Sequence, residues 1–169
     1  MKVSQSQTKS TQKTMVLVAN AMIAALYVAL CFVGPASGAI QFRVSESLNH
    51  VVVFNRKLIW GVLLGVVIFN QFFGYGLMDT LFGGGQTFLA LGLSALLQKK
   101  IKNVYLRLSL NVLFFTGSMF LIAIMLNITA DAPFWATYAS LAISEFIIMA
   151  LSAPVMYFVN QKIHFAERF

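Results

Sequence analysis

The chain has 169 residues, of which 59% are hydrophobic and 10% are charged, and its mean hydropathy is +0.82. An ordinary soluble domain is apolar over only about half of its residues, so apolar runs that recur along nearly the whole length indicate one integral membrane domain. The net charge of +7 would suit a nucleic-acid partner, but the basic residues fall in separate clusters between the apolar runs. That is the pattern of topology signals, and it excludes the nucleic-acid interpretation.

The first expected element is a membrane helix over about Met15–Val33. It follows residues 1–13, a Ser-, Thr-, Gln- and Lys-rich stretch that we expect to form a flexible cytoplasmic tail. The apolar run is about as long as a full span and further spans follow, so we interpret it as a retained helix and not as a signal peptide. We expect the membrane domain to cover residues 14–161 and a second cytoplasmic tail to cover residues 162–169.

A strip of alanines marks one face of this first helix. Ala21, Ala25 and Ala29 recur at four-residue spacing, which places them on one face. Small side chains at this spacing let two transmembrane helices approach closely. Two interpretations follow: the strip packs against the protein's own helices, or it docks a separate membrane subunit.

Only one long run with polar residues lies between the first and the last apolar segments: Gly34–His50, GPASGAIQFRVSESLNH. The apolar run Val44–Phe54 is too short to cross a bilayer upright, which takes about 17–25 residues. We therefore expect a short second helix, entered by a loop that dips into the membrane and is covered by protein. Because polar groups at membrane depth usually mark a site, we expect this stretch to form the outer lip of a small-molecule pocket.

Four longer apolar segments follow, over about residues 58–73, 77–97, 104–128 and 134–159. Gly61 and Gly65 predict a packing groove in the first of these, and Pro154 predicts a kink in the last. Six segments place both termini on one side of the membrane. Every basic cluster falls on that same side and only Arg43 falls on the other, which predicts six transmembrane helices with both termini in the cytoplasm.

Three carboxylates are candidates for a binding site: Glu46, Asp79 and Glu145. Facing one cavity, they could bind a cation or accept the paired N–H donors of a guanine- or pyrimidine-like edge. Asp79 also fits a helix N-terminus, where the dipole favours an acid, and Glu46 could pair with Arg43 three residues earlier. Glu145 has no basic neighbour within a turn, so a structural role explains it least well.

Other chemistry is poorly supported. Glu46 and His50 lie four residues apart, but two ligands are not a metal site, and the single Cys31 sits in an apolar run. The run Gly83–Thr87 lacks the lysine of a phosphate-binding loop and lies inside an apolar helix. We therefore expect no metal, no cofactor, no ATP site and no catalytic residues, because no nucleophile–base pair is evident.

Two motifs resemble those of the QueT family: GAIQFRVSESL at residues 38–48 and GLMDTLFG at residues 76–83. Members of that family are proposed queuosine-precursor transporters, substrate-binding S components of energy-coupling factor (ECF) transporters. The resemblance covers most of the chain, and it implies an all-α bundle of six helices with a short second helix. It also implies that Ala21, Ala25 and Ala29 dock on a transmembrane T component, and that two ATPase subunits supply the energy.

The same resemblance implies a pocket that opens outward and is capped by the loop containing Gln41 and Arg43. Its ligand would be a 7-deazaguanine such as the cationic aminomethyl form, and charge matching makes Glu46, Asp79 and Glu145 the candidates to bind it. An S component for a hydroxymethylpyrimidine or pyridoxine compound is the alternative within this class. A self-sufficient secondary carrier is the alternative outside it, although such carriers usually show two related halves and we find no internal repeat here.

Overall fold

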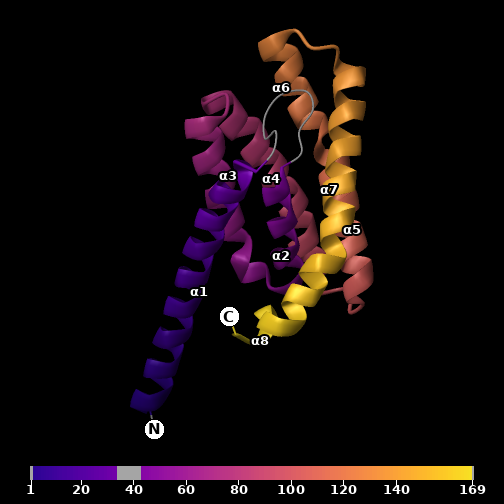
Figure 1. Cartoon of the computed structure of the whole chain (residues 1–169). Helices are drawn as coiled ribbons and strands as arrows, with labels where there is room; N and C mark the ends of the chain where they lie inside the picture. The colour runs from indigo at the N-terminus through magenta and orange to yellow at the C-terminus, as the bar shows by residue number, and fades with distance from the viewer. Residues whose placement is uncertain (1, 34–42, 169) are drawn as a thin grey trace.

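The computed structural model describes residues 2–33 and 43–168, with side chains from residue 10 onward, and its regular elements are all helices. They are α1 (Lys2–Cys31), the 3₁₀ helix η1 (Val44–His50), α2 (Val51–Phe54), the 3₁₀ helix η2 (Arg56–Leu58), α3 (Ile59–Phe73), α4 (Leu77–Leu97), α5 (Val104–Ser118), α6 (Phe120–Ala130), α7 (Phe134–Ile163) and α8 (Phe165–Arg168). Figure 1 shows one bundle with both chain ends at its lower end. The predicted all-α class is confirmed.

Five stretches are long and apolar enough to cross a membrane: Ser10–Cys31, Arg56–Phe73, Leu77–Leu97, Val104–Ala130 and Phe134–Ile163. Between the first two, η1 and α2 together occupy Val44–Phe54, the bounds predicted for the short second helix. The fourth span was expected as one helix but consists of α5 and α6, which meet at Met119. The count of six crossings and the cytoplasmic placement of the termini stay predictions.

The α1–α3 contact is closely packed because two glycines lie in it. A methyl group at Gly61 would lie 2.6 Å from the Asn20 carbonyl oxygen, and one at Gly65 would lie 2.6 Å from Tyr27 Cβ. The Asn20 side chain bridges the two helices, because its Oδ1 accepts from the Gly61 backbone N–H at 2.5 Å, and its Nδ2 donates to the Lys57 carbonyl in η2 at 3.1 Å. This is the packing groove that the glycine spacing predicts.

The alanine strip does not take part in this contact. Ala21, Ala25 and Ala29 are exposed, whereas Ala24 is buried and its carbonyl oxygen lies 3.1 Å from the position that a Gly65 methyl would take. Of the two interpretations of the strip, packing against the described helices of the same chain therefore does not hold. The strip faces outward on α1.

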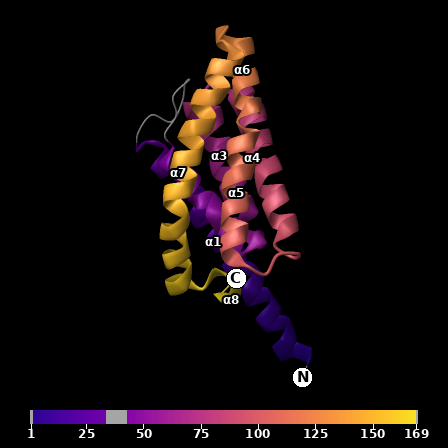
Figure 2. The ribbon, with the colours of Figure 1, turned by 90° about the vertical axis from the view of Figure 1, so that its right-hand side faces the viewer.

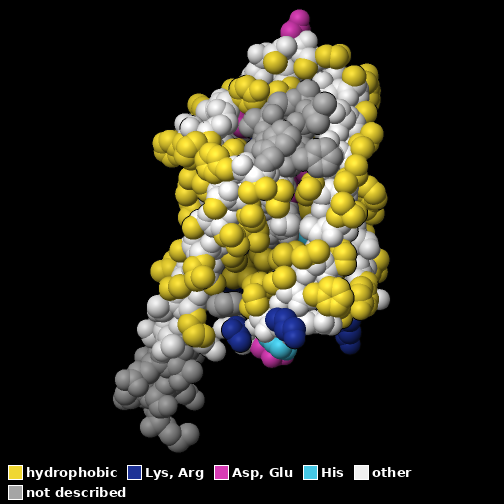
Figure 3. Space-filling model, in the orientation of Figure 1, with side chains coloured by type: hydrophobic (Ala, Val, Ile, Leu, Met, Phe, Trp, Pro, Cys, Tyr) yellow, Lys and Arg dark blue, Asp and Glu magenta, His cyan; other side chains and the backbone are white. Residues whose placement is uncertain are grey.

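Charge is unevenly distributed along the bundle. Lys and Arg side chains gather at the lower end of the molecule in Figure 3, beside the chain ends, and the flanks above them are largely hydrophobic. In Figure 2, α5 and α7 run side by side with the C-terminus below them. The side chain of Asn55 holds α8 at this basic end, because its Nδ2 donates to the Phe165 carbonyl at 2.9 Å.

Candidate functional site: a buried polar cluster

The centre of the site is Glu46, which lies on η1 where this short helix packs between α1 and α7. Glu46 is only 4% exposed. The hydroxyl of Tyr27, from α1, donates to its Oε1 at 2.7 Å. The Nδ2 of Asn49, one turn further along η1, donates to its Oε2. Each oxygen of this carboxylate therefore already accepts a hydrogen bond, as a buried acid requires.

Arg43, which precedes η1, interacts electrostatically with Glu46 and links the cluster to α3. Its guanidinium donates to Asn70 Oδ1 at 3.4 Å and lies 5.8 Å from the centre of the Phe69 ring. Asn70 in turn donates to the Asp79 carbonyl at 3.1 Å. The Asp79 side chain accepts from the Tyr75 backbone N–H at 3.3 Å, the contact expected of an acid in a first helical turn.

Glu145 approaches the cluster from α7. It is buried, and its charge interacts with those of Glu46 and Arg43. Arg43 also interacts electrostatically with Asp79. The fold thus brings together four of the predicted site residues: Glu46 on η1 with Arg43 just before it, Asp79 on α4 and Glu145 on α7. The fifth, Gln41, lies outside the described residues.

Two buried acceptors in this cluster are unused. Glu145 Oε1 and Asn49 Oδ1 have no hydrogen-bond partner among the residues that the structure describes. Leaving a buried polar atom unpaired costs about 1–3 kcal/mol, so such atoms are rare in stable proteins. Two of them in one cluster indicate a place where a ligand's donors would be accepted.

A second polar network lies one helical turn deeper. His50 Nε2 donates to the Met149 carbonyl at 3.0 Å, so the other ring nitrogen accepts from Asn111 Nδ2 at 3.2 Å. The Asn111 amide oxygen accepts from Ser94. This network occupies both nitrogens of His50 in holding η1 to α4, α5 and α7. Within the described part of the chain, no group of three His, Cys, Asp or Glu side chains could hold a metal ion.

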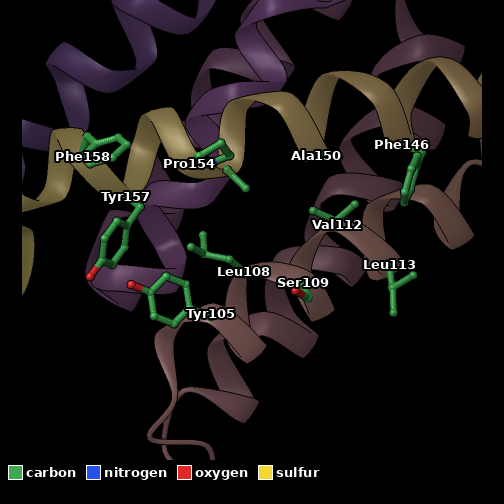
Figure 4. Close-up of a pocket in the computed structure, with 11 residues that line it drawn as sticks. Tyr105, Leu108, Ser109, Val112, Leu113, Phe146, Ala150, Pro154, Tyr157 and Phe158 are labelled. Atoms are coloured by element: carbon green, nitrogen blue, oxygen red, sulfur yellow. The ribbon is translucent and has the colours of Figure 1, made fainter.

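Two surface grooves differ in character from this cluster. One, of about 530 Å³, lies between α5 and α7 (Figure 4), where Tyr105 and Tyr157 flank one end and Phe146 the other. The second, of about 570 Å³, lies between α1 and α7 and includes Met22 and Leu26. No acidic or basic side chain lines either groove. Hydroxyl groups are the polar side-chain groups in both grooves, so neither offers the carboxylates that would compensate a cationic heterocycle.

One glycine of the run in α4, Gly83, serves close packing. A methyl group on Gly83 would collide with the Asn70 amide, and the Gln86 side chain is used in a hydrogen bond to Ser118 Oγ at 2.9 Å. These contacts hold α4 against α3 and α5. Close packing is therefore found at Gly83, whereas a methyl group on Gly85 would meet nothing within 4 Å.

Three members of the cluster were missed in the sequence: Tyr27, Asn49 and Asn70. Each is fully buried. A signal was available for two of them, because an asparagine inside an apolar membrane segment is itself an unusual polar group. Tyr27 offered no such signal, since tyrosine is equally common at membrane interfaces.

Comparisons with known proteins bear on this site. A family model described as "QueT transporter" matches residues 17–161. The chain is 39% identical over 155 residues to a protein of Lactococcus lactis subsp. cremoris (strain MG1363) named "Queuosine precursor transporter QueT". That alignment covers 85% of this chain and 91% of the relative. No solved structure matches.

Proposed function

The chain belongs to the QueT transporter family, and from this we propose that it is the membrane-embedded S component of an ATP-driven ECF-type importer for a queuosine precursor. Membership of a transporter family makes it a transport protein and not an enzyme, and its five candidate spans make it a multi-pass protein of the plasma membrane. The proposal adds three things to the family: the substrate, the way it is bound, and the partners that drive transport.

The substrate assignment rests on the buried acidic cluster. Glu46, Asp79 and Glu145 are all at most 6% exposed, and only Arg43 opposes them within the cluster. Buried charges need opposite charges or donors to compensate them. A 7-deazaguanine in its cationic aminomethyl form supplies both, through its ammonium group and the N–H donors of its guanine edge. We assign the binding role to these four residues together with Gln41.

The partner assignment rests on the alanine strip. Ala21, Ala25 and Ala29 form an exposed face of small side chains, which allows a second transmembrane helix to approach closely. The apolar groove between α1 and α7, beside Met22 and Leu26, continues this surface. We propose that a T component docks here, and that two ATPase subunits attached to it hydrolyse ATP.

Ligand binding is tested first on the purified chain. Gently purified protein is examined by native mass spectrometry and then titrated with 7-aminomethyl-7-deazaguanine, its neutral 7-cyano analogue and guanine. We expect the aminomethyl compound to bind tightest, because it alone adds a positive charge for the acidic cluster. A pyrimidine or pyridine vitamin found in the pocket would keep the transporter class and overturn the queuosine assignment.

Docking is tested by a matched pair of substitutions. Ala25→Leu puts a large side chain into the strip, whereas Ala139→Leu makes the same change at an exposed position of α7. In liposomes that also hold the T component and the ATPases, we expect Ala25→Leu to abolish ATP-driven uptake and to leave ligand affinity unchanged. Ala139→Leu should preserve both. Uptake by the chain alone in energised vesicles would instead establish a secondary carrier.

A further inference from the structure

We propose that Asn49 is a specificity-determining residue of this site: its Oδ1, together with Glu145 Oε1, accepts the N–H donors of the heterocycle, and Glu46 holds the amide in that orientation. The inference rests on the proposed function, since it concerns the same pocket. Charge alone suggests only the carboxylates of the cluster as contacts of the ligand. The hydrogen bonds of the cluster add the amide oxygen of Asn49 to these contacts.

The orientation of the Asn49 amide follows from its neighbour. An ionised carboxylate can only accept hydrogen bonds, and an amide donates only through its nitrogen. Glu46 Oε2 therefore draws the Nδ2 of Asn49 toward itself, and Oδ1 must point away from Glu46. Tyr27 holds the other oxygen of Glu46 at 2.7 Å, so the carboxylate that orients the amide is itself held in place.

The amide oxygen of Asn49 belongs to η1, which packs directly against α7. Asn49 is fully buried on η1, and its Oδ1 has no partner among the described residues. Glu145 Oε1, on the facing helix α7, is also buried and also has no hydrogen-bond partner among the described residues. The Glu145 carboxyl group interacts electrostatically with Glu46. His50 directly follows Asn49, and Met149 lies one turn after Glu145 on α7; the hydrogen bond between His50 and the Met149 carbonyl keeps η1 and α7 in register.

Other buried asparagines of the chain are satisfied, which sets Asn49 apart. Asn111 accepts from Ser94 and donates to His50. Asn70 accepts from Arg43 and donates to the Asp79 carbonyl. Both therefore have a complete structural role within the chain, whereas Asn49 uses only its nitrogen.

An amide oxygen beside a carboxylate is well suited to a guanine-type edge. That edge carries a ring N–H and an exocyclic amino group, and each donor needs its own acceptor. A site built to accept such donors discriminates strongly against an analogue that lacks one, because its buried acceptor is then left unpaired. The prediction is therefore about selectivity between ligands, and not only about affinity.

The test is a cycle of two proteins and two ligands. The ligands are 7-aminomethyl-7-deazaguanine and its analogue without the 2-amino group, and their dissociation constants are measured for the wild type and for Asn49→Leu, which has a similar volume. We expect the wild type to prefer the amino compound about ten- to hundred-fold. In Asn49→Leu that preference should be lost. If the leucine variant does not fold, Asn49→Ser keeps a hydroxyl donor for Glu46 on a shorter side chain, which places no acceptor at the position of Asn49 Oδ1. This variant should lose the preference too.

Asn111→Ala is the matched control, because it removes a buried amide that is fully satisfied within the chain. It should lower thermal stability and leave the ratio of the two affinities unchanged. If the wild type shows no preference, or if the Asn49 variants lower both affinities equally, Asn49 is a structural residue and the inference is overturned. If the wild type binds neither compound, the proposed substrate itself fails.

Discussion

Gly65→Ala tests the contact that positions the site on α1. The added methyl group would lie 2.6 Å from Tyr27 Cβ, 2.9 Å from Tyr27 Cγ and 3.1 Å from the Ala24 carbonyl oxygen. Non-bonded carbon atoms prefer separations of about 3.5–4.0 Å, so α1 and α3 must move apart by about 1 Å. None of these three atoms is the far end of a flexible side chain, so the strain cannot be relieved by a rotamer change.

The expected cost follows from two opposing effects. Overpacking a closely packed contact costs about 1–3 kcal/mol, and alanine stabilises a helix interior relative to glycine by about 0.5–1 kcal/mol. The middle values of these two ranges leave a net loss of about 1.3 kcal/mol, which lowers the midpoint of thermal unfolding by about 2–5 °C for a chain of this size. Ligand affinity should fall as well, since Tyr27 is displaced from the 2.7 Å hydrogen bond that holds Glu46.

The measurement is thermal unfolding in detergent together with ligand titration, and Gly92→Ala is the matched control. A methyl group at Gly92 would meet nothing within 4 Å. This variant should therefore unfold at the same temperature as the wild type or up to about 4 °C higher, by the helix-propensity gain alone, with unchanged affinity. If Gly65→Ala behaves like Gly92→Ala, α1 and α3 are not packed as described and the reasoning is refuted.

Three further predictions concern individual side chains. Tyr27→Phe removes the donor to Glu46 Oε1 and should weaken ligand binding about ten-fold in the same titration; unchanged affinity would show that this bond does not position the site. His50→Ala removes the hydrogen bonds of the imidazole to the Met149 carbonyl and to Asn111 Nδ2, and the unfolding temperature should fall by about 2–8 °C; a rise would contradict the network. Asn55→Ala releases α8, so hydrogen exchange there should quicken while ligand affinity stays constant, because the site lies at the other end of η1 and α2.

Much of the fold is determined by local features of the sequence. The length of Val44–Phe54 alone excludes an upright span, and the structure places a short helix within the same bounds. The spacing of Gly61 and Gly65 identifies a close helix contact, because glycine, which has no side chain, lets two helix backbones come closest together. These features depend on neighbours along the chain, so a reader of the sequence can find them.

The break between α5 and α6 at Met119 could not be found in this way. The span Val104–Ala130 is apolar throughout, and hydropathy measures composition, not the continuity of a helix. The distinction between exposed Ala21, Ala25 and Ala29 and buried Ala24 was equally hidden. In a membrane the lipid is as apolar as the protein core, so the hydrophobic pattern that reveals the buried face of a soluble helix is weak or lost.

For the polar cluster, too, some features are visible in the sequence and others only in the tertiary structure. The sequence by itself determined that Glu46, Asp79 and Glu145 lie in apolar surroundings, because a charge in a hydrophobic run is visible without any coordinates. Only the tertiary structure decided which of their oxygens are already paired, and that Asn49 and Glu145 each keep a buried acceptor. Most of these hydrogen-bond partners come from helices far apart in the chain, as Tyr27 does for Glu46 and as Met149 and Asn111 do for His50. Pairing is therefore a property of the packed bundle and not of any one segment.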